Sequence, residues 1–203
     1  YSGASAMVYS RWRRKVPQWL QVQPVALPGR GARFGAPLHT DMGPLAMQLA
    51  RDLRPTLQAP YALFGHSLGA LLACEIAHAL RELGCPEPVA LFASGTAAPT
   101  MRADYDRGFA TPKTDTELIE QLRTLNGTSE EVLANEELMA LTLPVLRADF
   151  LLCGRFQPRT RAPLKCPVHV LGGTTDKAST EQLIGWSRET SGSFSVDMLA
   201  GGH

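Results

Sequence analysis

The stretch from Tyr61 to Ala73 constrains the fold of this chain more than any other. A short apolar run leads into Gly-His-Ser-Leu-Gly at residues 65–69, and a long apolar helical pattern follows. A Gly-x-Ser-x-Gly turn between a buried strand and a buried helix is typical of a nucleophile elbow, which holds its serine in a strained conformation. We therefore predict that Ser67 is a nucleophile, and that Gly65 and Gly69 avoid collisions of Cβ atoms with the neighbouring strand and helix. The alternative is a glycine-rich turn whose serine only caps the helix, but the apolar pattern continues as a buried helix should.

Further patterns predict the elements around this turn. Short apolar runs predict buried strands at 89–93 and 167–171, and alternation predicts another at 194–199. The strand, helix and strand up to residue 93 imply a parallel pair with a right-handed crossover. Nearer the start, we expect a helix over 7–19 and a strand over 22–27, although prolines weaken both predictions.

Between about residues 100 and 163 the strand signal disappears and helical patterns take over, beginning with a capping box at Thr114–Glu117. A helical insertion between two strands of one sheet predicts a lid over the elbow, and an ordinary peripheral helical layer is the alternative. We predict one α/β domain over residues 1–203, with a mostly parallel sheet flanked by helices. The chain begins at Tyr1 and stops at His203, so we expect both ends to be clipped, with a first strand and a last helix outside this sequence.

The order of residues selects partners for Ser67. In folds built on such an elbow, the triad follows the chain order Ser, Asp or Glu, His. Only His203 follows Asp176, the acid that we expect, and it stands on a Gly-Gly loop after a predicted strand. His66 lies inside the turn, where we expect its ring to point the wrong way. The remaining histidines precede every candidate acid or lie within a strand: His39, His78 and His169.

Asp176 is the predicted acid, because it follows the strand at 167–171 through a glycine turn. Aspartates of the insertion, Asp149 among them, are assigned to the lid, and Asp197 falls within a strand pattern. The alternative for Asp176 is a loop residue that caps the helix beginning near Ser179.

Each predicted role follows from chemistry. A serine hydroxyl is a weak nucleophile, so His203 takes its proton and Asp176 holds the imidazole tautomer. The oxyanion needs two backbone donors. One is the N–H of Leu68, the residue after the nucleophile, and the other comes from an early loop, for which Tyr1–Ala4 is the only suitable small-residue segment.

Composition excludes several classes of function. The formal net charge is +1, with mixed signs, so nothing indicates nucleic-acid binding. No apolar run is long enough to cross a bilayer, and no signal peptide is visible. The four cysteines lack the spacing of a metal site, and we expect Cys74 to be a small core residue. A reducing cytoplasm is the compartment that best fits this use of cysteine. The loop at 28–35 lacks the Gly-x-Gly-x-x-Gly fingerprint of dinucleotide folds. A basic cluster at residues 11–15 is either a solvated surface or a contact for an acidic partner.

Taken together, these segments resemble the type II thioesterases of nonribosomal peptide and polyketide synthases, which are stand-alone α/β-hydrolases. The resemblance covers essentially the whole chain. It rests on the following segments: Tyr1–Ala4, Leu27–Gly31 with Arg33 and Phe34, Tyr61–Ala70, Ser94–Gly95, Leu143–Asp149, Gly172–Gly173 with Asp176, and Gly201–His203.

The resemblance implies a function and a partner. The enzyme would hydrolyse misprimed or stalled acyl and aminoacyl groups from the phosphopantetheine arm of acyl or peptidyl carrier proteins. The resemblance also assigns the triad to Ser67, Asp176 and His203 and the oxyanion donors to Ser2 and Leu68. Members often have Ala and Met at those two donor positions, but both residues donate through the backbone. No metal and no redox cofactor is expected, because a thiolate leaves readily, and we expect a monomer.

Three other readings remain. A carboxylesterase or lipase would share the elbow and the triad, and would differ in preferring oxygen esters. An acyltransferase would pass the acyl group to an alcohol or amine instead of water. A non-catalytic carrier-binding module with a decayed site is the third, and the intact set of Ser67, Asp176 and His203 argues against it.

Overall fold

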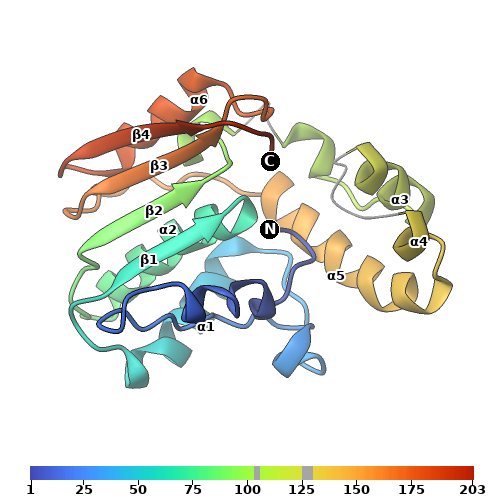
Figure 1. Ribbon diagram of the computed structural model, residues 1–203, viewed down its shortest axis with the longest axis horizontal. Coiled ribbons are helices and arrows are strands. Elements are labelled where there is room, and N and C mark those ends of the chain that lie inside the picture. The colour runs from blue at the N-terminus through green and yellow to red at the C-terminus, as the bar shows by residue number, and fades with distance from the viewer. Residues whose placement is uncertain (103–105, 125–129) are drawn as a thin grey trace.

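The structure is a computed structural model that describes residues 1–102, 106–124 and 130–203. Its centre is a parallel sheet of four strands in the order β1-β2-β3-β4 (Figure 1). The strands span Ala62–His66, Ala90–Ser94, Val168–Gly173 and Phe194–Leu199. The four strands predicted around and after the elbow are therefore confirmed, each within about three residues.

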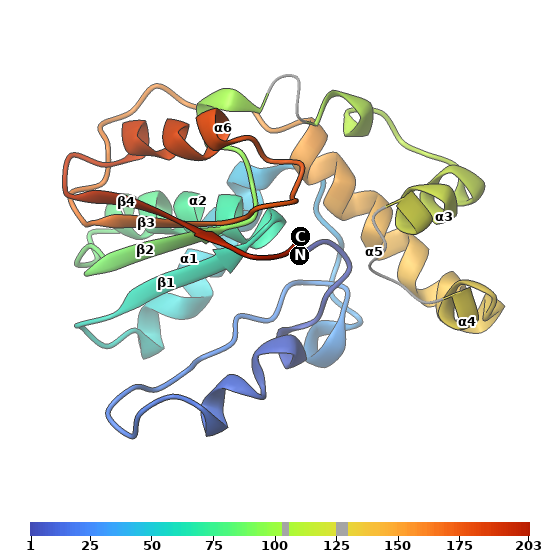
Figure 2. The ribbon, with the colours of Figure 1, turned by 45° about the horizontal axis from the view of Figure 1, so that its top comes forward.

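Helices cover one side of this sheet, as Figures 1 and 2 show for α1, α2 and α6. Helix α2 (Leu68–Glu82) packs on β1 and β2, and α1 (Met42–Leu53) packs on α2. Asp41 caps α1 by accepting a hydrogen bond from the N–H of Gly43 at 3.1 Å. Helix α6 (Thr180–Ile184) begins with a capping box at Ser179, and the 3₁₀ helix η7 (Gly185–Glu189) follows it.

The main core lies between α2 and the sheet. Small residues of α2 face β2 and β3, which lets the helix approach the strands closely. Trp186 is fully buried in this core, and its indole N–H donates to the carbonyl of Thr96 at 3.0 Å. A second apolar cluster joins α1 to the other face of α2. The elbow helix is thus fixed on two sides.

The predictions of a helix over 7–19 and of a strand over 22–27 are wrong. In place of a helix over 7–19, the chain forms two short 3₁₀ turns, η1 (Ala6–Tyr9) and η2 (Trp12–Arg14). Residues 22–27 form no strand. They lie across an apolar cavity of about 450 Å³ from β1, so their backbone does not reach the hydrogen-bonding groups of that strand. Rings of Tyr9 and Trp12 pack on Phe64 of β1 instead.

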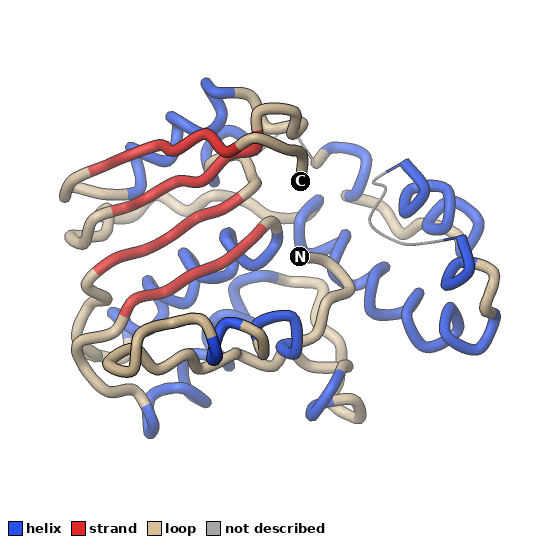
Figure 3. Tube along the Cα trace, in the orientation of Figure 1, coloured by secondary structure: helices blue, strands red, loops and turns tan. Residues whose placement is uncertain are grey.

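The helices of the insertion stand apart from the sheet, beyond the end toward which the strand arrows point in Figure 1, and the tube in Figure 3 shows the same separation. They are α3 (Asp115–Thr124), α4 (Glu130–Leu133) and α5 (Glu136–Gly154). The predicted capping box at Thr114 is confirmed, since Thr114 and Glu117 exchange hydrogen bonds. These helices share an apolar cluster of their own. Pro144 lies inside α5.

Within the described residues, none of the helices combines the length and the apolar character that a membrane span requires.

Candidate active site

Ser67 occupies the sharp turn between β1 and α2. Its backbone angles are φ 57° and ψ −122°, and it is the one non-glycine residue with positive φ in the described part of the chain. Such a conformation is costly for a residue with a Cβ, and it persists only where the surrounding structure enforces it. The N–H of Ser67 donates to the carbonyl of Ser94 on β2 at 2.8 Å, which ties the turn to the neighbouring strand.

The two glycines of the turn have different roles. A Cβ at Gly65 would lie 1.9 Å from the carbonyl oxygen of Gly69 and 2.4 Å from the nitrogen of Ala70. The close approach of β1 to the first turn of α2 therefore requires glycine at 65, as predicted. The prediction for Gly69 is wrong, because a Cβ there would meet nothing within 4 Å. Gly69 contributes the backbone against which Gly65 lies.

Asp176 and His203 are in direct contact. His203 Nδ1 lies 2.9 Å from Asp176 Oδ2, and the Asp176 side chain is only 3% exposed. The other carboxylate oxygen accepts a hydrogen bond from the N–H of Lys177 at 2.6 Å. A carboxylate only accepts, so Nδ1 of His203 carries the hydrogen and Nε2 presents a lone pair. An imidazole in this tautomer is ready to accept a proton.

Backbone hydrogen bonds hold the two loops that carry this pair. The N–H of Thr174 donates to the carbonyl of Leu199, and the N–H of Thr175 donates to the carbonyl of Gly201, both at 2.9 Å. A Cβ at Gly173 would lie 2.6 Å from the carbonyl oxygen of Gly202. The loops after β3 and β4 therefore run together, which brings residues 176 and 203 to the same point.

The segment Tyr1–Ala4 forms a tight turn beside these loops. The N–H of Ala4 donates to the carbonyl of Tyr1 at 3.1 Å, and Gly3 has φ 79°, as the third residue of a type II turn requires. The ring of Tyr1 meets the ring of His66 edge-on at 6.4 Å. Residues 1 and 203 lie side by side in both views of the ribbon (Figures 1 and 2). The predicted oxyanion segment and the predicted triad thus lie in one region.

Comparison with known proteins gives the family. Residues 1–203 match the thioesterase domain family. The chain belongs to the thioesterase family. The protein LgrE of Brevibacillus parabrevis, named a linear gramicidin dehydrogenase, is 40% identical to this thioesterase over 207 residues, which cover 100% of this chain and 78% of the relative.

Two solved structures extend the likeness to three dimensions. The RedJ thioesterase of the prodiginine pathway of Streptomyces coelicolor is similar with a TM-score of 0.91 and 38% identity, covering 99% of this chain and 75% of that one. The type II thioesterase BorB of the borrelidin cluster gives a TM-score of 0.87 and 35% identity, covering 100% and 82%. The thioesterase therefore has the α/β-hydrolase fold of these proteins and acts as a thioester hydrolase.

One further side chain lies at the site, contrary to expectation. The ring of His66, expected to point the wrong way, lies 4.8 Å from the ring of His203, and its Nδ1 lies 3.0 Å from the Ser94 hydroxyl. Burial, followed by the nearby His203, lowers the pKa of His66 to about 4. His66 is therefore a neutral wall beside His203 near neutral pH. Its place as the last residue of β1, directly before Ser67, was the sequence signal that could have placed it at the site.

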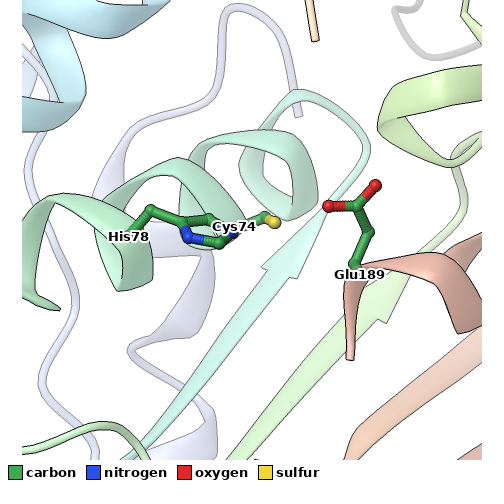
Figure 4. Close-up of side chains that lie close together, drawn as sticks. All are labelled: Cys74, His78 and Glu189. Carbon is green, nitrogen blue, oxygen red and sulfur yellow. The ribbon is translucent and has the colours of Figure 1, made fainter. Parts of the chain in front are cut away.

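A second cluster of polar side chains lies farther along α2, where Cys74, His78 and Glu189 approach one another (Figure 4). Their ligand atoms fall within 4.8 Å of one another, and His78 Nε2 is buried without a hydrogen-bond partner. However, His78 Nδ1 lies 2.8 Å from a guanidinium nitrogen of Arg81, which can only donate. Nδ1 is therefore the acceptor and Nε2 carries the hydrogen. A metal needs a lone pair at Nε2, so this cluster does not present a metal site.

Two of the remaining candidates, His169 and Cys74, are structural. His169 stacks on Phe92 at 5.0 Å and contacts the Ser195 hydroxyl on the sheet, as predicted. Cys74 is fully buried in the main core, and burial raises the pKa of its thiol well above the usual value. The arginines and lysine of the basic cluster at 11–15 are exposed.

Proposed function

We propose that this thioesterase is a stand-alone type II enzyme that releases misprimed or stalled acyl and aminoacyl groups from the phosphopantetheine arm of acyl or peptidyl carrier proteins. One observation carries the proposal: a strained Ser67 at the elbow lies in the same region as the Asp176–His203 pair, within a chain of the thioesterase family. The likeness to BorB, a type II thioesterase, supports the role in an assembly line.

The proposed reaction begins with acylation. Nε2 of His203 takes the proton of Ser67 Oγ as the oxygen attacks the thioester carbonyl, and the N–H groups of Leu68 and Ser2 stabilise the negative oxygen of the tetrahedral intermediate. The C–S bond then breaks, and the imidazolium returns its proton to the departing sulfur. Asp176 stabilises the imidazolium throughout, because its Oδ2 accepts from Nδ1.

Deacylation repeats these steps with water. His203 takes a proton from water, the resulting oxygen attacks the acyl-serine, and the bond to Ser67 Oγ breaks as the proton moves back to that oxygen. The products are the free acid and the carrier thiol. No metal or redox cofactor takes part in the proposed reaction, because the chemistry of thioester hydrolysis needs none.

The helices of the insertion fit a substrate carried on a long, thin arm. Since α3, α4 and α5 stand beyond the strand ends, we propose that they form a lid that the arm passes beneath.

An esterase or an acyltransferase would use the same residues and would differ only in substrate or acceptor. The name of LgrE indicates a dehydrogenase, but the glycine-rich loop at 28–35 of this chain lacks the fingerprint for dinucleotides.

The test measures release of acetyl from an acetyl-phosphopantetheinyl carrier protein by the wild type and by Ser67→Ala. We expect the substitution to lower turnover by at least about 10³-fold, leaving the contribution of the oxyanion donors and binding. A p-nitrophenyl ester is assayed in parallel. If the wild type cleaves the oxygen ester through Ser67 but releases nothing from the carrier, the proposed assembly-line function is wrong, and only the assignment as a serine hydrolase stands.

A further inference from the structure

The side chain of Asp149 leaves the predicted lid and reaches the turn at the start of the chain. It projects from α5, is fully buried, and has Oδ2 at 2.8 Å from the N–H of Gly3. Its two oxygens also accept hydrogen bonds from the two terminal nitrogens of Arg30, each at 2.6 Å. The carboxylate therefore joins three segments that are far apart in the sequence.

Arg30 holds the same turn from its other side. It is 8% exposed, and while Nη1 and Nη2 bind Asp149, Nη1 also lies 3.5 Å from the carbonyl oxygen of Ala4. Its Nε donates to the carbonyl of Pro28 at 3.4 Å, which fixes the guanidinium to its own loop. A planar guanidinium with two parallel bonds to a carboxylate is a rigid unit. The Asp149–Arg30 pair, called the clamp from here on, thus binds one N–H and one C=O of the same turn.

These bonds determine which N–H of the turn is free. The N–H of Ala4 donates a hydrogen bond to the carbonyl of Tyr1, and the N–H of Gly3 donates one to Asp149. Within residues 1–102, 106–124 and 130–203, the N–H of Ser2 donates to no protein acceptor. The clamp therefore orients the turn so that a single N–H remains available to an external acceptor.

Helix α5 supports the turn at a second point one helical turn earlier. A Cβ at Gly3 would lie 2.8 Å from a methyl group of Leu146, so the side chain of Leu146 packs directly against the turn. Leu146 also belongs to the apolar cluster that α5 shares with α3 and α4. The turn is fixed between a charged clamp and an apolar contact, and both come from α5.

We infer that Asp149 and Arg30 are positioning residues, which hold the Tyr1–Ala4 turn so that the Ser2 N–H serves as an oxyanion donor. This inference rests on the proposed function. A donor must point at the oxygen of the tetrahedral intermediate, and loss of one donor costs about 10²–10³-fold in turnover. A loosened turn loses this stabilisation in the transition state, while binding of the substrate itself is unchanged.

The first variant is Asp149→Asn, which keeps the size of the side chain but removes its charge. We expect kcat per active site to fall about 10-fold to 100-fold with KM within 2-fold of wild type, measured on a short acyl thioester of N-acetylcysteamine. Active sites are counted by the endpoint of Ser67 labelling with a fluorophosphonate, so unfolded protein does not lower the value. Affinity for an alkyl boronic acid, which mimics the tetrahedral intermediate, should weaken by the same factor.

The second variant separates positioning from stability. Arg30→Met with Asp149→Leu replaces both buried charges by apolar groups, which restores stability relative to either single change because no unpaired charge remains. We expect this double variant to melt close to the wild type and still to show the low kcat. Glu75→Gln is the matched control, because it breaks the buried Glu75–Arg161 ion pair elsewhere on α2. It should lower the melting temperature without changing kcat per active site.

The outcomes are distinct. If Asp149→Asn and the double variant both keep wild-type kcat and boronic acid affinity, Asp149 and Arg30 are structural only and the inference is wrong. A rise in KM with unchanged kcat also contradicts it. Failure of the proposed function would appear in the wild type itself. A wild type that cleaves the short thioester through Ser67 but not the carrier-bound one leaves this test intact, and one without any Ser67-dependent turnover overturns both.

Discussion

Replacing Gly65 by alanine should damage the elbow more than any other single methyl group added to this chain. The new Cβ would lie 1.9 Å from the carbonyl oxygen of Gly69 and 2.2 Å from its carbonyl carbon. Both are backbone atoms, so no side chain can rotate out of the way. The separation between β1 and the start of α2 must increase by about 1.1 Å to reach about 3.0 Å, below which Cβ contacts essentially do not occur.

This displacement has two measurable consequences. Forcing extra volume into a packed site costs typically 1–3 kcal/mol of unfolding free energy, and we expect Gly65→Ala at the upper end because α2 is held on both sides. A shift of about 1 Å at a nucleophile lowers the rate by about 10²-fold. Urea unfolding gives the first quantity, and hydrolysis of an N-acetylcysteamine thioester per fluorophosphonate-labelled site gives the second.

The control is Gly108→Ala, which adds a methyl group where nothing lies within 4 Å and the backbone has no positive φ. It should change the unfolding free energy by less than about 0.5 kcal/mol, as surface substitutions usually do, and leave turnover unchanged. If Gly65→Ala instead matches this control in both stability and turnover, the close approach of strand and helix does not exist in solution. The account of the elbow would then be refuted.

Two further predictions concern charge. Burial and two neighbouring arginines lower the pKa of His78 to about 3, so between pH 6.5 and 3 the unfolded chain takes up a proton that the native chain does not. The unfolding free energy should therefore decrease on acidification, and His78→Gln should make this decrease shallower by up to about 1.4 kcal/mol per pH unit in urea titrations. Equal slopes would contradict the assigned pKa. In the basic cluster, Arg11→Glu with Arg14→Glu should raise KM for a carrier-bound acyl group at low salt and leave a small thioester unaffected, whereas Arg188→Glu, another exposed arginine, should affect neither. Equal effects on both substrates would show that the cluster does not contact the carrier.

Local patterns predicted the elements that are held by their own sequence or by adjacent elements. The strand, turn and helix around Ser67 are contiguous, and each of their requirements is met within about 20 residues. The capping box of α3 likewise lies within four residues, from Thr114 to Glu117. Here the physical constraint is short in range, so the sequence expresses it directly.

Predictions for the start of the chain were wrong because a strand needs a partner. Residues 22–27 have an apolar pattern that suits a strand, but the structure places a cavity between them and β1. Without neighbouring hydrogen-bonding groups at about 4.8 Å, an extended segment does not become part of a sheet. Its pattern alone could not reveal that distance.

Chain order and chemistry led from the sequence alone to a nucleophile at Ser67 and to Asp176 and His203 as its partners, since a tight turn and the end of a strand each leave a local signature. Only the tertiary structure showed that the rings of His66 and His203 meet, and that Asp149 binds Arg30 and Gly3 across 119 and 146 residues of chain. Contacts of this kind depend on how whole elements pack against one another. They arise from the summed burial of many side chains, and no spacing within a single segment encodes them.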